Sequence, residues 1–215
     1  MIKNIVFDLD GTLLDTLEDL RDSVNHILGQ YGYPGRTLEE TRRFVGNGIP
    51  KLCERAAPDG IAKDELAVIV SEVRAWYTEH SKIKTRPYDG MIDNVNKLRL
   101  RGVRTAVVTN KAEPAAQKLC SEIFGDIFDA VIGDDGGPLK PDPANVRRAM
   151  SAMGAIQAQT VYVGDSEVDV RTAKNAGLKC VGVLWGFRDR RTLEIAGADV
   201  IIERPEELIP VLETL

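Results

Sequence analysis

Six short apolar runs constrain the fold of this chain more than any other feature. Most are β-branched and show no alternation of polar and apolar positions. Such runs are typical of strands that are buried on both faces of a parallel sheet. They occupy residues 5–7, 105–108, 130–132, 160–163, 180–183 and 199–202.

Helical patterns separate these runs in the second part of the chain. Met91, Val95 and Leu98 have i, i+4, i+7 spacing, and Gly102 then ends the pattern. Similar patterns stop at Gly154 and, for residues 167–176, at the following glycine. Strands that alternate with helices predict a doubly wound α/β sheet, a Rossmann-like core.

The stretch between the first two runs differs, because it has helical patterns and no convincing strand. Leu17, Leu20 and Val24 begin one helix, Thr37 to Glu40 form a capping box that opens another, and Ile69 to Tyr77 lie in a third. We therefore expect residues 1–15 and 87–215 to form the α/β core, with residues 16–86 inserted as an all-helical cap.

Charge and cysteine content exclude several classes of function. The formal net charge is −5, and no run of Lys and Arg is longer than a pair, which argues against a nucleic-acid partner. The first apolar run is too short for a signal peptide or membrane span, so we expect a cytoplasmic protein. The three cysteines form no CxxC pair, which argues against a zinc site.

Carboxylates follow two of the predicted strands. Asp8 and Asp10 come after the first, and Asp165 and Asp169 come after the fourth. In open α/β sheets the ligand crevice lies outside the carboxyl ends of the strands, so these side chains meet if the two strands are neighbours. Such a cluster needs a cation among its oxygens, and oxygen ligands without His or Cys favour Mg²⁺.

Two further strand ends fit a phosphate site. Thr109 and Asn110 follow the second strand and offer a hydroxyl and backbone N–H groups to a phosphoryl oxygen. Lys140 follows the third strand after a glycine-rich loop, where its ammonium would neutralise charge on a transferring phosphoryl group. Trp185, Gly186 and Phe187 follow the fifth strand, and either line the cleft or close the sheet edge.

In this order and spacing, the motifs resemble the four-motif set of the haloacid dehalogenase superfamily. They are Asp8-Leu9-Asp10-Gly11-Thr12-Leu13, Thr109-Asn110, Lys140-Pro141 and Gly164-Asp165-Ser166-Glu167-Val168-Asp169. The resemblance implies a helical cap after the first motif, in agreement with the insertion.

The resemblance also implies a role for each position. Asp8 would attack phosphorus and form an aspartyl-phosphate, and Asp10 would act as general acid and then general base. The Asp8 side chain, the Asp10 backbone carbonyl and Asp165 would hold Mg²⁺. Gly11, Thr109, Asn110 and Lys140 would bind the phosphoryl group, with Asp169 orienting Lys140 or the waters of the metal. An Asp at position 10 is typical of the phosphatases and mutases of the superfamily, rather than of its dehalogenases or its ATPases.

Residues in and near the predicted cap narrow the range of expected substrates. Residues 44–50, 86–90 and 107–111 resemble those of bacterial phosphoglycolate phosphatases, which implies that a small phosphorylated metabolite, 2-phosphoglycolate, is hydrolysed to glycolate and phosphate. Asn47 and Gly48, in a turn at a helix start, would face the active site and bind the substrate carboxylate.

Other interpretations of the same residues remain open. Asp169 also fits the role of an acidic residue in the first turn of a helix, and Thr109 that of a helix N-cap. Lys140 also fits a solvated loop, and Gly46-Asn47-Gly48 fits a plain connection between two helices. The enzymatic alternatives are a sugar-phosphate phosphatase or β-phosphoglucomutase-like enzyme, and a pyrophosphatase or nucleotidase. A non-catalytic module that binds a phosphorylated metabolite is the alternative from another class. Oligomeric state is not addressed by any of these patterns.

Overall fold

The computed structural model describes all 215 residues, which separate into two compact units. Met1–Leu14 and Pro87–Leu215 form one, here called the sheet unit. Asp15–Arg86 form the other, here called the helical unit. No helix in either unit combines the length and the apolar character needed to cross a membrane.

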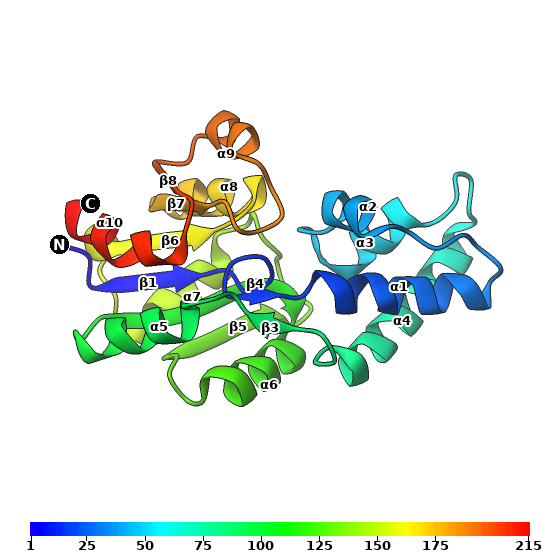
Figure 1. Cartoon of the computed structure of the whole chain (residues 1–215), viewed down its shortest axis with the longest axis horizontal. Helices are drawn as coiled ribbons and strands as arrows, with labels where there is room; N and C mark the ends of the chain where they lie inside the picture. Colours follow the sequence, from blue (N-terminus) through cyan, green and yellow to red (C-terminus); the bar gives the residue numbers. More distant parts are fainter. The chain divides into compact units, whose positions relative to one another are not determined.

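The sheet unit is built on six parallel strands, as the apolar runs predicted (Figure 1). Their spatial order is β5-β4-β1-β6-β7-β8, so β1 lies in the interior between β4 and β6. The bounds are β1 Asn4–Phe7, β4 Arg104–Ala112, β5 Ala130–Asp134, β6 Thr160–Gly164, β7 Lys179–Val183 and β8 Val200–Ile202. Successive strands are added on one side of β1 as β4 and β5, and on the other side as β6, β7 and β8. This switch in strand order places a ligand crevice at the carboxyl end of β1.

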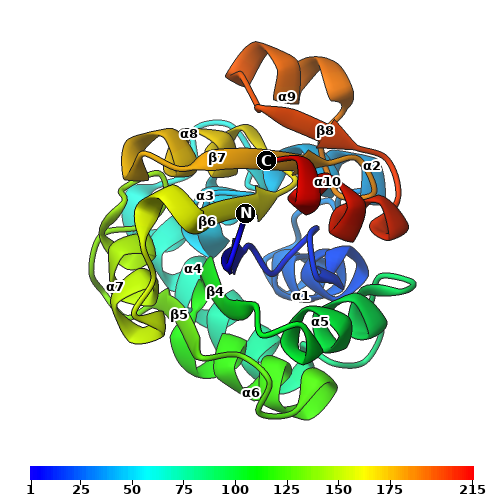
Figure 2. The same cartoon turned by 90° about the vertical axis from the view of Figure 1, so that its left-hand side faces the viewer.

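Helices cover both faces of the sheet, which confirms the doubly wound prediction (Figure 2). One face carries α5 (Met91–Leu100), α6 (Glu113–Phe124) and α10 (Leu208–Thr214). The other carries α7 (Ala144–Met153), α8 (Glu167–Ala176) and α9 (Arg190–Ala196). Two short 3₁₀ helices, η1 (Gln157–Gln159) and η2 (Pro205–Glu207), complete the unit.

Alternation along each strand divides its side chains between two cores. Ile5 and Phe7 of β1 lie in the core under α5 and α6, whereas Val6 lies in the core under α7 and α8. All three are fully buried. Full burial of such a side chain contributes roughly 1.5–3 kcal/mol, and this explains why the strands read as continuous apolar runs.

The helical unit contains four helices and a core of its own. They are α1 (Leu17–Gln30), α2 (Leu38–Phe44), α3 (Gly48–Ala56) and α4 (Lys63–His80). The predicted capping box is present, since Thr37 accepts from the Glu40 N–H while Glu40 accepts from the Thr37 N–H. Ile69, Val73 and Tyr77 of α4 are buried, as their spacing predicted.

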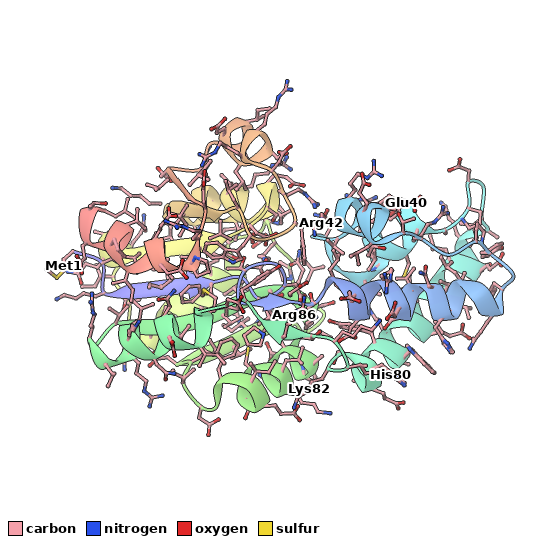
Figure 3. All side chains as sticks on the ribbon, viewed as in Figure 1. Met1, Glu40, Arg42, His80, Lys82 and Arg86 are labelled. Carbon is pink, nitrogen blue, oxygen red and sulfur yellow. The ribbon has the colours of Figure 1, made fainter.

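Two very short strands, β2 (Leu14–Asp15) and β3 (Arg86–Pro87), pair where the chain leaves and re-enters the sheet unit. The sequence pattern predicts no strand within 16–86, and Arg86 is the exception. Two residues are too few to produce a period-2 pattern, so this pairing has no signal in the sequence. The Arg86 guanidinium, labelled in Figure 3, also lies 3.1 Å from Asp15 Oδ2.

A buried carboxylate fastens the last segment of the helical unit to its first helix. Asp19 of α1 is 3% exposed and accepts hydrogen bonds from the backbone N–H groups of Lys84, at 3.0 Å, and Thr85, at 2.8 Å. A carboxylate can satisfy several donors that would otherwise lack partners in this irregular segment. Asp22, one turn later, instead forms an exposed ion pair with Lys84 at 2.7 Å.

This difference predicts unequal effects of removing the two carboxylates. Asp19→Ala should lower the free energy of unfolding by about 2 kcal/mol, because two backbone donors lose a charged acceptor. Asp22→Ala, the matched control on the same helix, should change it by no more than about 0.5–1 kcal/mol, because the ion pair is exposed. Urea unfolding measures both values, and equal effects would contradict the role given to Asp19.

Candidate active site

The candidate site lies where β1, β4 and β6 end. In the two pairings of β1, Phe7 is opposite Val107 of β4 and Val163 of β6. Asp8 and Asp165 therefore follow neighbouring strands within two residues of this common level. The carboxylates can meet only if β1 and β6 are neighbours, and the pairing of these two strands establishes this adjacency.

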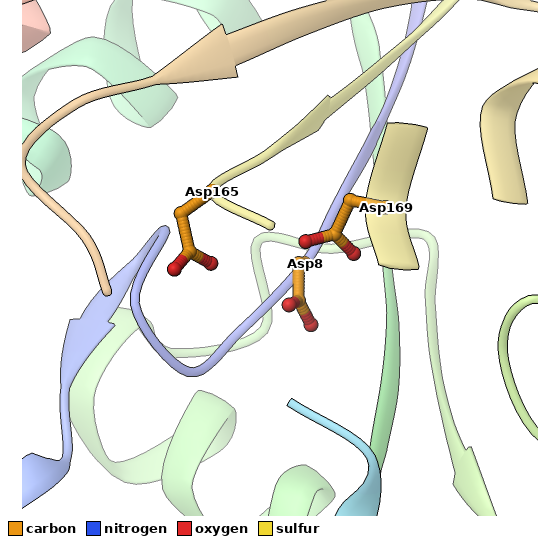
Figure 4. A group of neighbouring side chains, drawn as sticks. All are labelled: Asp8, Asp165 and Asp169. Carbon is orange, nitrogen blue, oxygen red and sulfur yellow. The ribbon is translucent and has the colours of Figure 1, made fainter. Parts of the chain in front are cut away.

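Three carboxylates converge there, as Figure 4 shows. Asp8, Asp165 and Asp169 each place one oxygen within 4.8 Å of the others, and all three residues are buried. Like charges at this separation in a poorly solvated place repel one another strongly. The cluster is stable only where positive charge or protons compensate it.

Lys140 supplies part of this compensation. Its Nζ lies 2.8 Å from Asp8 Oδ1 and 2.7 Å from Asp169 Oδ1, and its side chain is 3% exposed. Burial lowers the pKa of this ammonium, but the Asp169 and Asp8 carboxylates outweigh that effect and hold the pKa above its usual value. Lys140 is therefore a permanent cation within the site, and its interpretation as a solvated loop lysine is wrong.

Asp169 combines the two interpretations that sequence analysis left open. It is the third residue of α8, where its Oδ2 accepts from the N–H and the hydroxyl of Ser166, at 3.1 and 2.6 Å. Its Oδ1 meanwhile accepts from Lys140 and from the Tyr162 hydroxyl, at 2.7 and 3.2 Å. The helix cap thus fixes the carboxylate that fixes Lys140.

The other two carboxyl groups resist ionisation in the absence of a cation. Burial and, after it, the charge of the neighbouring Asp169 together raise the pKa of Asp165 to about 7. Burial and Asp169 likewise raise the pKa of Asp8 well above its usual range, despite the opposing effect of Lys140. A bound cation would stabilise the ionised form of both carboxyl groups.

The composition of the site fits a hard divalent cation. Four carboxylates, those of Asp8, Asp10, Asp165 and Asp169, face only two buried ammonium groups, those of Lys111 and Lys140. The donors are all oxygen, which is the preference of Mg²⁺, Ca²⁺ and Mn²⁺. Because Asp169 is occupied by Lys140, Tyr162 and Ser166, Asp8 and Asp165 are the side chains with capacity for a metal.

The loop between β7 and α9 holds Asp165, a function that sequence analysis did not anticipate. The Phe187 N–H donates to Asp165 Oδ2 at 2.8 Å, and the Trp185 indole N–H donates to the Thr12 carbonyl at 3.0 Å. Thr12 in turn donates its hydroxyl to Asp165 Oδ1 at 3.1 Å. A Cβ on Gly186 would lie 2.3 Å from the Asp165 Cβ, so only glycine permits this approach.

Gly11 takes part in the site differently from the expected phosphate contact. Its N–H donates to the Leu14 carbonyl at 2.8 Å and is therefore engaged within its own loop. Its φ is +86°, and a Cβ would lie 2.5 Å from Asp165 Oδ2. The residue makes room for the Asp165 carboxylate beside the loop that carries Asp8 and Asp10.

Thr109 and Asn110 lie at the end of β4, both buried. Thr109 caps no helix, since the N-cap of α6 is Ala112, and its hydroxyl oxygen accepts from the Lys111 N–H at 3.2 Å. The Asn110 amide bonds to the Lys140 backbone in both directions, at 2.8 and 3.2 Å. Its side chain thus positions the Lys140 loop, and any contact of Asn110 with phosphate is left to its backbone.

Asp10 stands beside Lys111, a residue to which the sequence patterns assign no role. Lys111 Nζ lies 2.9 Å from Asp10 Oδ1, an ion pair whose angles are not those of a hydrogen bond. The side chain of Lys111 is 2% exposed. The only sequence signal for this pair was the position of Lys111 directly after Thr109-Asn110.

Asn47 and Gly48 belong to the helical unit, where Gly48 begins α3. Arg55 of the same helix donates to the Phe44 carbonyl at 2.6 Å and to Asn47 Oδ1 at 3.0 Å. These two bonds hold the Gly46-Asn47-Gly48 turn in one shape. The expected place of Asn47 and Gly48 at the substrate stays a prediction.

The raised pKa of Asp165 predicts a pH-dependent response to Mg²⁺. A carboxyl whose folded pKa, about 7, exceeds the unfolded value of 3.8 binds protons more tightly when folded, so it destabilises the metal-free protein as pH rises through that interval. A divalent cation such as Mg²⁺ would bind the ionised form. Its apparent affinity should therefore fall about tenfold between about pH 8 and about pH 6 for a carboxyl with this pKa.

Thermal unfolding with and without Mg²⁺ measures this effect. The increase in Tm on adding Mg²⁺ should be larger near the higher pH, and Asp165→Asn should abolish it at both. An increase that is the same at both pH values would exclude Asp165 as the titrating ligand.

Comparison with known proteins agrees with this architecture. Residues 5–183 match the family model described as haloacid dehalogenase-like hydrolase. The chain is 36% identical to a phosphoglycolate phosphatase of Pseudomonas putida, over 96% of this chain and 78% of that protein. It is 37% identical to a phosphoglycolate phosphatase of Pseudomonas savastanoi pv. phaseolicola, over 97% and 79%.

The fold comparison gives the same family. A crystal structure of a protein from Lactobacillus delbrueckii subsp. bulgaricus, provisionally assigned as a phosphoglycolate phosphatase, superposes with a TM-score of 0.92. The two chains are 31% identical, and the match covers 98% of each. Motifs, strand order, buried carboxylates and relatives agree, and the chain belongs to the haloacid dehalogenase-like hydrolase family.

Proposed function

We propose that this hydrolase is a Mg²⁺-dependent phosphatase that hydrolyses 2-phosphoglycolate to glycolate and phosphate through an aspartyl-phosphate on Asp8. The observation that carries the reaction type is the placement of Asp8 between a permanent cation, Lys140, and the metal-competent Asp165. The substrate rests on the curated relatives, which are named phosphoglycolate phosphatases.

Asp8 is the proposed nucleophile. Its Oδ1 is fixed by the Leu9 N–H at 2.7 Å and by Lys140 at 2.8 Å, so the carboxylate is held rigidly at the strand end. As a carboxylate oxygen bonds to phosphorus, the bond from phosphorus to the substrate oxygen breaks, and the phosphoryl group passes to Asp8. Lys140 stays beside this oxygen and offsets the charge that gathers there.

Asp10 is the proposed proton donor and acceptor. It would protonate the alkoxide as this leaves phosphorus, and would then remove a proton from the water that attacks the aspartyl-phosphate. Attack by that water releases phosphate and restores the Asp8 carboxylate. The Asp10 side chain is 21% exposed, so water and leaving group can reach it.

Asp8, Asp165 and the Asp10 backbone carbonyl are the groups that would hold Mg²⁺. The cation would supply positive charge to the phosphoryl oxygens and to the carboxylates around them. Thr12, Phe187 and Trp185 orient Asp165 for this purpose, through the hydrogen bonds described above.

The first test is phosphate release from a panel of 2-phosphoglycolate, hexose phosphates, nucleotides and pyrophosphate, with Mg²⁺ and with EDTA. We expect Mg²⁺-dependent preference for 2-phosphoglycolate. Asp8→Asn should lower kcat by roughly 10³-fold or more, because the nucleophile is lost. Asp126→Asn, an exposed carboxylate in the same unit, is the control and should leave kcat unchanged.

Each other outcome discards a stated part of the proposal. Preference for a sugar phosphate, a nucleotide or pyrophosphate would keep Asp8 and reject the substrate. Full activity of Asp8→Asn would reject the nucleophile. Absence of hydrolysis, together with binding of phosphorylated compounds, would identify a non-catalytic module.

A second test concerns the turn that Arg55 holds in the helical unit. If Asn47 and Gly48 bind the substrate carboxylate, Asn47→Ala should raise KM for 2-phosphoglycolate by roughly tenfold, the effect of one or two lost hydrogen bonds to a charged group. The KM for p-nitrophenyl phosphate, which has no carboxylate, should stay the same. An equal rise for both substrates would show that the turn does not select the carboxylate.

A further inference from the structure

Only two lysines of the chain are buried, and each lies against one of the paired aspartates of the first motif. Lys140 holds Asp8 Oδ1 at 2.8 Å, and Lys111 holds Asp10 Oδ1 at 2.9 Å. An ammonium withdrawn from water is unfavourable unless a carboxylate compensates it. The Lys111–Asp10 pair is therefore a built part of the site, and the mechanism above does not yet use it.

The two oxygens of Asp10 have different surroundings. Oδ1 is fully buried and lies against the Lys111 ammonium. Oδ2 is not buried, and no group of the protein donates a hydrogen bond to it. The exposed part of this side chain is accordingly on the Oδ2 side.

We propose that Lys111 is the positioning residue for Asp10, so that Oδ2 is the oxygen that exchanges protons with leaving group and water. This inference rests on the proposed function. Lys111 acts through Asp10 and need not touch the substrate. It restrains rotation of the carboxylate about its Cβ–Cγ bond, and it stabilises the negative charge that remains after the proton has left.

Each proton that Asp10 Oδ2 gives up is regained within the same turnover. Asp10 begins with a proton on Oδ2. As Asp8 bonds to phosphorus and the bond to the substrate oxygen breaks, this proton passes to that oxygen and the alcohol departs. Oδ2 then takes a proton from water, whose oxygen bonds to phosphorus while the bond to Asp8 breaks.

Leaving groups of different basicity test this role without any change of pH. An alkoxide needs a proton to depart, whereas p-nitrophenolate is a weak base and departs without one. The substrates are compared by kcat/KM, because this constant reports only the steps from substrate binding to departure of the leaving group. The substrates are 2-phosphoglycolate, glycerol 2-phosphate as an alkyl ester without a carboxylate, and p-nitrophenyl phosphate.

Lys111→Met removes the charge with little change of length. It should lower kcat/KM for both alkyl esters by roughly 10- to 100-fold, the usual effect of misplacing a catalytic group, and for p-nitrophenyl phosphate by less than about threefold. Lys111→Gln should recover part of this loss, because its amide keeps a polar N–H group on the Oδ1 side of the carboxylate. Lys118→Met, an exposed lysine of α6, is the control and should change neither value.

Asp10→Asn separates failure of this inference from failure of the proposed function. It should show the same dependence on the leaving group, with a larger loss of about 10²-fold or more for the alkyl esters. If Asp10→Asn shows no such dependence, the acid–base assignment itself is wrong. If Asp10→Asn shows it and both Lys111 variants do not, only the role of Lys111 is overturned.

Two further results would also overturn the inference. Equal losses on all three substrates in folded Lys111→Gln, with folding checked by circular dichroism, would make Lys111 a general structural residue. A loss confined to 2-phosphoglycolate would mean that Lys111 binds the substrate carboxylate directly.

Discussion

The excess of negative charge at the end of β1 is the constraint on which the site depends. Asp8, Asp165 and Asp169 are brought within 4.8 Å of one another in a buried place, where water cannot screen them. Lys140 compensates two of them directly, through contacts of 2.8 and 2.7 Å. Burial and the remaining charge raise the pKa values of Asp8 and Asp165, and the donor set of the site fits a divalent cation.

Much of the surrounding structure keeps these charges in place. Ser166 caps α8 and holds Asp169, Asn110 holds the Lys140 backbone, and the Phe187 N–H holds Asp165. Gly11 and Gly186 leave the space that the Asp165 carboxylate occupies. In a phosphatase, such preorganisation is what allows fixed charges to act on a transition state without first rearranging.

The fold and the principal carboxylates were predictable because their signals are local. Buried parallel strands require apolar runs, and all six runs are strands of one sheet. The glycines after α7 and α8 end these helices in the left-handed conformation, as predicted. The rule that ligands bind at the carboxyl ends of strands then directs attention to the residues after β1 and β6, where the carboxylates are found.

By itself, the sequence determined the type of fold, the edge of the sheet that carries chemistry, and the residues that approach it from each strand. Only the tertiary structure decided which groups touch. It shows that Lys111 lies against Asp10 and that the Gly11 N–H is engaged with Leu14. It also shows that the Phe187 N–H holds Asp165 and that the Trp185 indole holds the Thr12 carbonyl. The physical reason is that periodicity and capping depend on neighbours a few residues apart, whereas an ion pair across a hundred residues depends on strand order and packing.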